Sequence, residues 1–211
     1  MLGASCAQGS TEDMFWKPKE ENFWKWFQAN ESRLFDFEQD QDRVFGELGP
    51  EMKKVHPDLT FEFGPKKDGR REFVISADGN RNAFPAVVAL ADKAPELQRW
   101  EIIKFRQRRG RLPDLGYEGT RVKSEDIEFT IEPDRDKAGI TLFIKGYDET
   151  SHQRLVTIGF LYLDSTLGEY DVETKVGFVN FKAANEQTTL VKRPISELPK
   201  VFDDFVASRL N

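Results

Sequence analysis

Apolar positions follow a helical spacing through the first part of the chain. One stripe recurs from Phe23 to Leu34, and a second one recurs from Phe45 to Val55. Since an α-helix turns once every 3.6 residues, such stripes place the apolar side chains on one face. The pattern predicts N-terminal helices over residues 20–56.

Two prolines mark limits within this helical region. Pro50 follows Gly49, and Pro57 follows His56. Proline lacks the backbone N–H that an inner helical turn needs, and it pushes the residue before it away from helical geometry. We expect Gly49-Pro50 to break the second helix into two pieces. We expect the helix to end at His56-Pro57.

The apolar period then changes to two, which is the spacing of β-strands. Residues 59–63 alternate, and residues 72–76 are apolar and β-branched. A helical stripe follows over residues 84–93, and a further strand pattern covers residues 99–105. The order predicts a strand-strand-helix-strand (ββαβ) unit over residues 58–106.

The second half of the chain repeats this order. Strand patterns cover residues 126–132, 140–147 and 174–181. The segment 151–167 between the last two is open to two interpretations, because its centre also has the composition of a strand. Its length and its match to the helix of the first half favour a helix buried on most sides. We therefore predict a second ββαβ unit over residues 126–182.

Together these elements predict an α+β fold. It would consist of two ββαβ (ferredoxin-like) units forming an antiparallel or mixed sheet, with flanking N- and C-terminal helices, the last one over residues 196–210. Hairpins open each unit, which disfavours a doubly wound parallel sheet. We predict a flexible tail over residues 1–18 and a single domain over residues 19–211.

Composition is that of a soluble globular protein. The 211 residues are 38% hydrophobic and 32% charged, and 18 phenylalanines predict an aromatic core. A net charge of −6 disfavours general binding to polyanions such as nucleic acid. No apolar run is long enough to span a membrane, so we expect a cytoplasmic protein. The sequence leaves the oligomeric state open.

Cysteine and histidine supply little material for chemistry. The chain has one cysteine, Cys6, and two histidines, His56 and His152. These numbers exclude an internal disulfide and disfavour a zinc site or a catalytic triad. No nucleotide-binding glycine motif is present. We therefore expect no cofactor and no bound metal.

One acidic motif could carry chemistry. Asp164, Glu169 and Asp171 lie close together in the segment 163–173, directly after an apolar run. Converging carboxylates can hold a divalent ion, and that would make the protein a metal-dependent hydrolase. We favour a structural interpretation, in which a helix ends at Gly168 between Asp164 and Glu169. Asp171 and Glu173 would then lie in a connector to the next strand, and the whole group would be solvated.

A cluster of arginines lies in the segment 105–111. Arg106, Arg108 and Arg109 belong to it. Guanidinium groups bind phosphate or carboxylate oxygens in pairs, so the cluster could bind RNA or an acidic protein partner. The simpler interpretation is a solvated strand end that nearby carboxylates offset.

Trp24 and Trp26 are candidate anchors for a protein partner. Being two residues apart, they cannot lie on one helical stripe, and an exposed tryptophan often contributes strongly to an interface. Packing of both against the sheet is the interpretation we favour. Farther along, Asp78-Gly79 is typical of a turn, while Ser76 or Asp78 lining a ligand pocket is the functional alternative.

Three stretches carry a resemblance to a known family. They are FWKWF, the long run from REFVISADG through FPAVVALADKAPELQRWEIIKFRQRRG, and LDSTLGEYDVETKVGFV. Together they resemble an uncharacterised bacterial family of domains of unknown function, from about Phe23 to Phe181. The resemblance implies a bacterial source and an α+β fold, and it implies no mechanism. The ββαβ order is also similar to ferredoxin-like regulatory domains, which is an analogy of fold alone.

These observations favour a non-catalytic binding or regulatory protein that acts through contacts with another protein. The basis is the lack of a recognisable catalytic motif, together with the aromatic N-terminal helix and the separate arginine and acidic segments. The two alternatives are a divalent-metal-dependent hydrolase that uses the carboxylates of 164–173 and an RNA-linked regulator that uses the arginines of 106–111.

Overall fold

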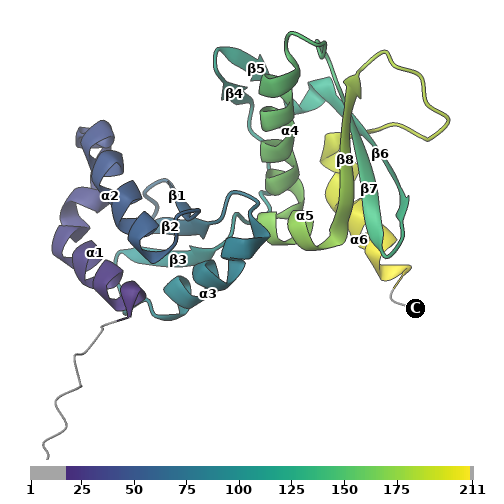
Figure 1. Cartoon of the computed structure of the whole chain (residues 1–211). Coiled ribbons are helices and arrows are strands. Elements are labelled where there is room, and N and C mark those ends of the chain that lie inside the picture. Colours follow the sequence, from purple (N-terminus) through teal and green to yellow (C-terminus); the bar gives the residue numbers. More distant parts are fainter. Residues whose placement is uncertain (1–17, 210–211) are drawn as a thin grey trace, which may run out of the picture.

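The computed structural model describes residues 18–209, which fold into two lobes that lie side by side (Figure 1). These residues form six α-helices and three small β-sheets, so the prediction of an α+β fold is confirmed. The tail predicted over residues 1–18 lies outside the described residues except for Pro18, and so does Cys6. None of the described helices is both long and apolar enough to span a membrane.

The first lobe is a three-stranded sheet with helices on one face. The strands lie in the order β1-β2-β3, where β1 is antiparallel to β2 and β3 is parallel to β2. A parallel third strand requires a crossover, and α3 provides it. The elements are α1 (Lys19–Phe35), α2 (Gln41–Val55), β1 (Thr60–Phe63), β2 (Arg71–Ser76), α3 (Phe84–Asp92) and β3 (Trp100–Lys104).

The core of the first lobe is built mainly from aromatic rings. Phe27 of α1 packs 5.0 Å from Phe73 of β2 and 5.1 Å from Trp100 of β3, measured between ring centroids. Val87 and Leu90 of α3 belong to the same buried cluster. Alternate strand residues point to opposite faces of the sheet. One set packs against these helices, and the other set points to a face that no helix of this lobe covers.

The helix α2 continues through Pro50, which corrects the expectation that Gly49-Pro50 would break it. A proline ring in a helix crowds the carbonyl group four residues earlier, which here belongs to Gly46. Apart from the neighbouring backbone of the helix itself, no atom lies within 4 Å of the place where a Cβ of Gly46 would sit, so no other element crowds this turn. Leu48 and Met52 are fully buried on either side of Pro50, and this burial holds the helix in place.

The second lobe has a four-stranded sheet and a separate hairpin. The sheet has the order β8-β7-β6-β9, in which β6 and β7 are antiparallel and β8 is parallel to β7. Its elements are β4 (Leu115–Tyr117) and β5 (Thr120–Val122) in the hairpin, then β6 (Ile127–Asp134), β7 (Lys137–Ile144), α4 (His152–Leu167), α5 (Glu169–Lys175), β8 (Val176–Ala183), β9 (Arg193–Pro194) and α6 (Leu198–Ala207).

Residues 152–167 form a helix, which confirms the favoured interpretation of that segment. The helix α5 corrects another expectation, because Asp171 and Glu173 lie on a helix and not in a connector. Periodicity could not show this seven-residue helix, since two turns are too short to produce a clear stripe. The hairpin β4–β5 and the short strand β9 were also missed.

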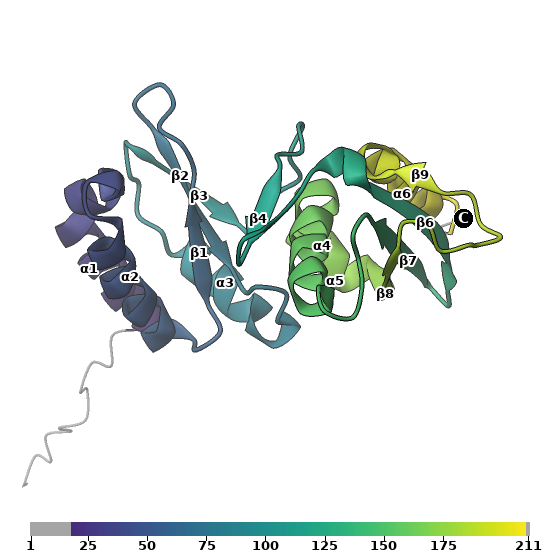
Figure 2. The same cartoon turned by 90° about the horizontal axis from the view of Figure 1, so that it is seen from above.

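The buried apolar residues form two separate clusters, one in each lobe. The single domain proposed over residues 19–211 therefore contains two cores. In the view from above, the sheet of the first lobe lies between its helices α1 and α2 and the second lobe (Figure 2). The strands of the two halves belong to different sheets, and the ferredoxin-like arrangement is not confirmed.

Candidate functional site at the junction of the lobes

The arginine segment and the acidic segment meet where the lobes join. The chain leaves β3 at Phe105, whose φ of 59° turns the backbone sharply toward the second lobe. The N–H of Arg109 then donates to the carbonyl oxygen of Ser165 at 2.7 Å, and the N–H of Glu169 donates to the carbonyl oxygen of Arg106 at 3.0 Å. Two motifs that lie sixty residues apart in sequence thus form one structure.

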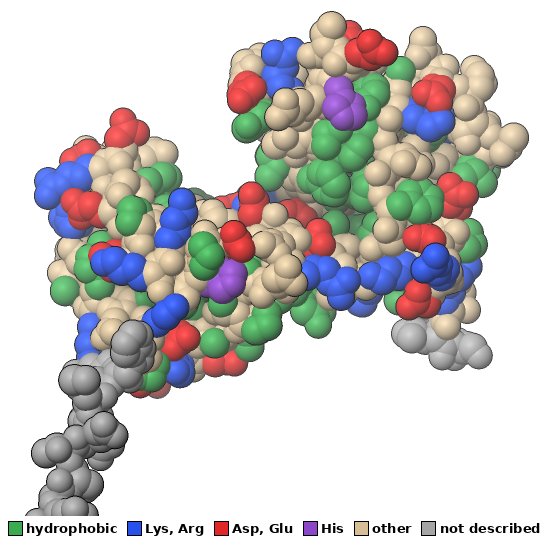
Figure 3. Space-filling model, in the orientation of Figure 1, with side chains coloured by type: hydrophobic (Ala, Val, Ile, Leu, Met, Phe, Trp, Pro, Cys, Tyr) green, Lys and Arg blue, Asp and Glu red, His purple; other side chains and the backbone are tan. Residues whose placement is uncertain are grey.

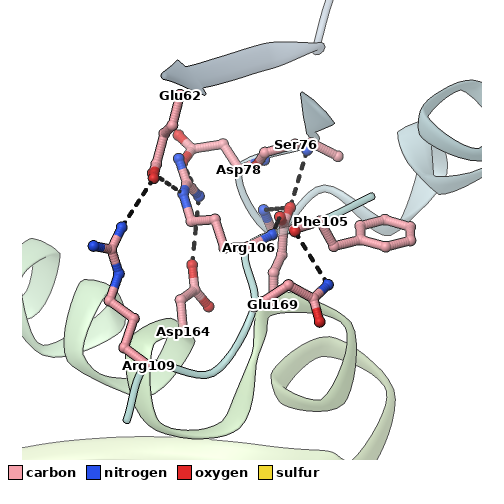
Figure 4. Close-up of polar contacts among 11 residues, drawn as sticks. Glu62, Ser76, Asp78, Phe105, Arg106, Arg109, Asp164 and Glu169 are labelled. Atoms are coloured by element: carbon pink, nitrogen blue, oxygen red, sulfur yellow. Dashed lines mark hydrogen bonds and ion pairs between the residues drawn. The ribbon is translucent and has the colours of Figure 1, made fainter. Parts of the chain in front are cut away.

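Glu169 is the centre of this junction and is fully buried. Its Oε1 accepts hydrogen bonds from the N–H groups of Ala77 at 2.9 Å and Gly79 at 3.2 Å, both in the loop after β2 (Figure 4). Its Oε2 accepts one from the N–H of Arg106 at 3.1 Å. The expectation that Glu169 is solvated is therefore wrong: the carboxylate joins the second lobe to the first.

Gly168 allows this placement. Its φ of 82° lies in the region that favours glycine, and it ends α4 and starts α5 in one step. A Cβ at this position would sit 3.4 Å from the carbonyl oxygen of Arg106. The glycine that the sequence identifies as a helix end also lets the two chain segments approach closely.

Arg106 binds carboxylates from three elements. Its guanidinium contacts Glu62 of β1, Asp78 of the loop after β2 at 2.9 Å and Asp164 of α4 at 3.4 Å (Figure 4). Its side chain is 14% exposed. Burial alone would lower the pKa of Arg106, but the hydrogen bond to Glu62 and the neighbouring carboxylates raise it. The interpretation of Arg106 as part of a solvated strand end is therefore wrong.

Asp164 is an acid with an unusual protonation equilibrium. Burial raises its pKa to about 7, and the charges of Glu169, Asp78 and Glu173 act in the same direction, while Arg106 opposes them. Burial also raises the pKa of Glu173. The carboxyl of Asp164 therefore changes its charge near neutral pH, at the place where the lobes meet.

Arg108 ties the same junction to the C-terminal helix. It donates to the carbonyl oxygen of Leu167 at 2.8 Å, to Asp171 of α5 at 2.8 Å and to both carboxylate oxygens of Asp203 on α6, at 3.0 and 2.9 Å. The hydrogen bonds that Arg108 donates to Asp203 and Asp171 raise its pKa against the effect of burial. Asp171 also pairs with Lys175 at 2.7 Å.

The three candidate catalytic residues are thus used in three different ways. Glu169 accepts backbone hydrogen bonds, Asp171 pairs with Arg108, and Asp164 faces Arg106. Within residues 18–209, no group of three or more His, Cys, Asp or Glu side chains is placed to hold a metal ion. What the arrangement does chemically is to join two lobes through charge-assisted hydrogen bonds.

A cleft of about 360 Å³ opens beside this junction, between the lobes. The bare face of the first sheet lines one wall, through Glu62, Glu72 and Val74, and Leu161 of α4 lines the other. Arg109 also lines the cleft. Its side chain is 57% exposed, and among residues 18–209 its one ion pair is with Glu62 at 3.3 Å. The molecule is visibly hollowed between the two lobes (Figure 3).

The candidate anchors Trp24 and Trp26 lie far from this cleft, on α1. Trp24 is 3% exposed, and its indole N–H donates to the carbonyl oxygen of Leu90 at 2.8 Å. Trp26 is half-buried and packs against the same core. The structure therefore favours packing, and Trp24 offers no surface to a partner.

Sequence reasoning missed several residues of the junction. Glu62 lies between Phe61 and Phe63 in β1, and this alternation could have shown that it faces away from the core. No pattern in the sequence around Asp203 indicates its role, because its partner Arg108 lies 95 residues away. Ala77 contributes only a backbone N–H, which no residue type reveals.

Comparison with known proteins adds no relative to this picture. The chain matches no protein-family model, no curated protein and no solved structure.

Proposed function

We propose that this chain is a non-catalytic binding protein that takes an acidic segment of a partner protein into the cleft between its lobes. The observation that carries the proposal is the cleft itself, with its incompletely paired arginine. The carboxylates and guanidiniums deeper in the junction are bound to one another, so they hold the two walls in place and leave recognition to the rim.

The charge of the rim supports an acidic partner. Arg109 has one contact of 3.3 Å for its five N–H donors. Arg111, two residues farther on, is exposed, and none of the described residues forms an ion pair or side-chain hydrogen bond with it. Two neighbouring guanidiniums with free donors suit carboxylates of a protein segment.

The walls support a segment of protein over a small ion. Val74, Ile103 and Leu115 add apolar surface to the cleft, alongside the polar groups. A mixed wall of this kind suits an extended chain that places apolar side chains between its charged ones.

Site-specific photocrosslinking tests the proposal. A photoreactive amino acid in place of Glu72, which is exposed in the cleft, should capture a partner in the native host. The same substitution at Val191, which is 72% exposed on the second lobe away from the cleft, is the matched control. Mass spectrometry should place the crosslink from position 72 in a segment rich in Asp and Glu.

Charge reversal gives the second arm of the test. With Arg109→Glu and Arg111→Glu together, capture from position 72 should fall by about tenfold or more, because two attractive contacts become repulsive. The proposal fails if positions 72 and 191 capture the same proteins, or if the double reversal leaves capture unchanged.

The alternatives have less support. The carboxylates of the hydrolase hypothesis are bound to N–H groups or arginines, as described above, and Arg106 and Arg108 of the RNA hypothesis are paired with acids. Saturable binding of Mg²⁺ or Mn²⁺ in a titration would support the hydrolase hypothesis. Saturable binding of RNA at low and moderate salt would support the RNA hypothesis.

We also propose that the two lobes are copies of one structural unit. In each lobe two antiparallel strands are followed by a helix and by a strand parallel to the second one, which supports two copies of one ββαβ unit. The ferredoxin-like character, the bacterial family resemblance and a cytoplasmic location remain predictions.

A further inference from the structure

The second lobe presents a long open strand. The eight-residue strand β8 forms the outer edge of the four-stranded sheet and pairs only with β7 (Figure 2). The opposite edge, β9, has two residues, one of them Pro194. An open edge carries unpaired N–H and C=O groups, which another extended strand can satisfy.

Strand β8 has few of the features that usually keep an edge strand from pairing with another strand. The strand VGFVNFKA contains no proline and one charged residue, Lys182. The ammonium of Lys182 is bound to Glu186 four residues later. Since proteins block edges with charges and prolines, a long strand with so few of them is suited to pairing.

An apolar patch lies beside this edge. Phe160 of α4 is 40% exposed, and its ring lies 5.4 Å from that of Phe181, measured between centroids. Val179 and Phe181 are half-buried and pack against the core of the lobe. Figure 3 shows hydrophobic side chains gathered over α4 and β8 on the second lobe. An edge with an apolar border gains both hydrogen bonds and burial on pairing.

We propose that β8 pairs antiparallel with β8 of a second copy of this chain, about a two-fold axis at Asn180. In an antiparallel pair, residues directly opposite each other share a face. With the axis at Asn180, Val179 then lies opposite Phe181 of the second copy, and Phe178 lies opposite its Lys182.

These pairings make the strand complementary to itself. A β-branched residue opposite an aromatic ring and an ammonium beside an aromatic ring are both favourable cross-strand pairs. Asn180 is exposed and meets its own amide across the axis. The two Phe160–Phe181 patches come to lie on the same side, because a two-fold axis normal to the sheet keeps the faces of both copies aligned.

Other registers fit less well. The pairing of β7 and β8 is irregular between Ala138 and Gly139, so β8 is regular only after Gly177. An axis at Val179 would place Gly177, at the irregular end of β8, opposite Phe181 of the second copy. An axis at Phe181 would place Phe178 beyond the end of the partner strand. The axis at Asn180 keeps the pair within the regular residues.

A disulfide placed on the axis tests the register. In a Cys6→Ser background, Asn180→Cys brings two thiols into directly opposite positions, with Cα atoms about 5 Å apart, which a disulfide can span. The matched control is Lys182→Cys, on the same face of the strand. Its two copies would lie about 14 Å apart in this register and cannot be bridged.

Mild oxidation of the full-length protein should convert Asn180→Cys to a covalent dimer and leave Lys182→Cys monomeric. Sedimentation of the unmodified chain should show a reversible dimer, and Asn180→Lys should weaken it by about tenfold or more, because like charges then meet on the axis. Gln187→Lys adds the same charge at an exposed site outside the strand and should leave the dimer unchanged.

The proposal is overturned if both cysteine variants crosslink equally or neither does. It is also overturned if the unmodified chain stays monomeric at all concentrations, or if Asn180→Lys and Gln187→Lys behave alike. These readouts do not depend on the cleft, so they separate this proposal from the proposed function.

Discussion

The two lobes share an order of elements but differ in how their cores are filled. In the first lobe eight of the 19 residues of the buried cluster are aromatic, whereas in the second lobe three of 17 are. The first core relies on stacked and edge-on rings, and the second relies mainly on branched aliphatic side chains. The same topology therefore tolerates two packing solutions, provided that the volume is filled.

The lobes differ more sharply in the connector from helix to last strand. In the first lobe that connector contains no helix, and its charged residues pair within the lobe: Lys93 with Glu20 and Arg99 with Glu31. In the second lobe Gly168 starts α5, and Glu169 reaches into the other lobe. In the second lobe, one glycine and one buried carboxylate thus turn the connector into a contact between the two lobes.

Removing that carboxylate should have the largest effect. Glu169→Ala leaves three N–H groups without this acceptor, one in a buried and two in part-buried hydrogen bonds, and we expect a loss on the order of 5 kcal/mol in the free energy of unfolding. In a Trp16→Phe background, used for every variant, the remaining tryptophans are Trp24, Trp26 and Trp100, which all lie in the first lobe. Urea unfolding by fluorescence then reports that lobe, while circular dichroism reports both.

In the Trp16→Phe background alone the two transitions should coincide, and in Glu169→Ala they should separate. Glu169→Gln keeps one acceptor oxygen and should lie between the two. As the control, Glu197→Ala removes an exposed carboxylate of a helical ion pair and should change little. A single, coincident transition in Glu169→Ala would show that Glu169 does not couple the lobes.

The protonation of Asp164 should give the next largest effect. Its pKa is 3.8 in an unperturbed chain and about 7 in the folded protein. The folded state therefore binds the proton more tightly, and this contribution to stability is full below about pH 4 and is lost as the pH rises through about 7. A difference of about three pKa units corresponds to about 4 kcal/mol.

Unfolding by urea at several pH values measures this loss. Asp164→Asn cannot ionise, so its free energy of unfolding should rise relative to the unmodified chain as the pH increases from about 4 to about 7. Asp204→Asn, which changes a carboxylate that is 67% exposed, should run parallel to the unmodified chain. Parallel curves for Asp164→Asn would contradict the assigned titration.

Two helical glycines sharpen the contrast in packing. A Cβ at Gly159 of α4 would lie 2.4 Å from the ring of Phe181, whereas a Cβ at Gly46 of α2 would meet nothing within 4 Å. Gly159→Ala should therefore cost about 2 kcal/mol through overpacking. Gly46→Ala should instead stabilise the first lobe by about 0.5 to 1 kcal/mol, because alanine favours the helix. Thermal unfolding measures both, and equal signs would contradict the packing described here.

Arg108 should give the smallest effect. Arg108→Ala removes partly exposed bonds to Leu167, Asp171 and Asp203, and we expect a loss of about 1 kcal/mol. Lys200→Ala breaks an ion pair whose lysine is 82% exposed and should cost less than a measurable amount. Chemical denaturation compares the two variants, and equal costs would show that Arg108 does not help to join α5 and α6.

Much of the fold could be predicted from the sequence. The α+β class and the strands β1, β2, β3, β6, β7 and β8 follow from local periodicity, which a chain shows without its tertiary contacts. The helix over 152–167 follows from the length of its segment and its match to the helix of the first half. Leu163, Leu167 and Val172, the apolar residues of the acidic segment, are all buried. These predictions hold because burial of an apolar face is the largest favourable term in folding.

The candidate site could be predicted only as two separate motifs. Arg106 and Glu169 were both singled out, yet nothing in their local sequence shows that the backbone of one hydrogen-bonds to the carboxylate of the other. An aspartate or glutamate is written the same way in the sequence whether its carboxylate is solvated or buried. Their difference depends on donors contributed by distant backbone, here at Ala77 and Gly79.

By itself, then, the sequence determined where helices and strands form and which of their faces are apolar, because those properties depend on neighbours along the chain. Only the tertiary structure decided that there are two cores, that LDSTLGEYDVE and FRQRRG meet between them, and that Asp164 titrates near neutral pH. The physical reason is that desolvation and charge pairing depend on what surrounds a group in space, and the packing of the two lobes sets those surroundings.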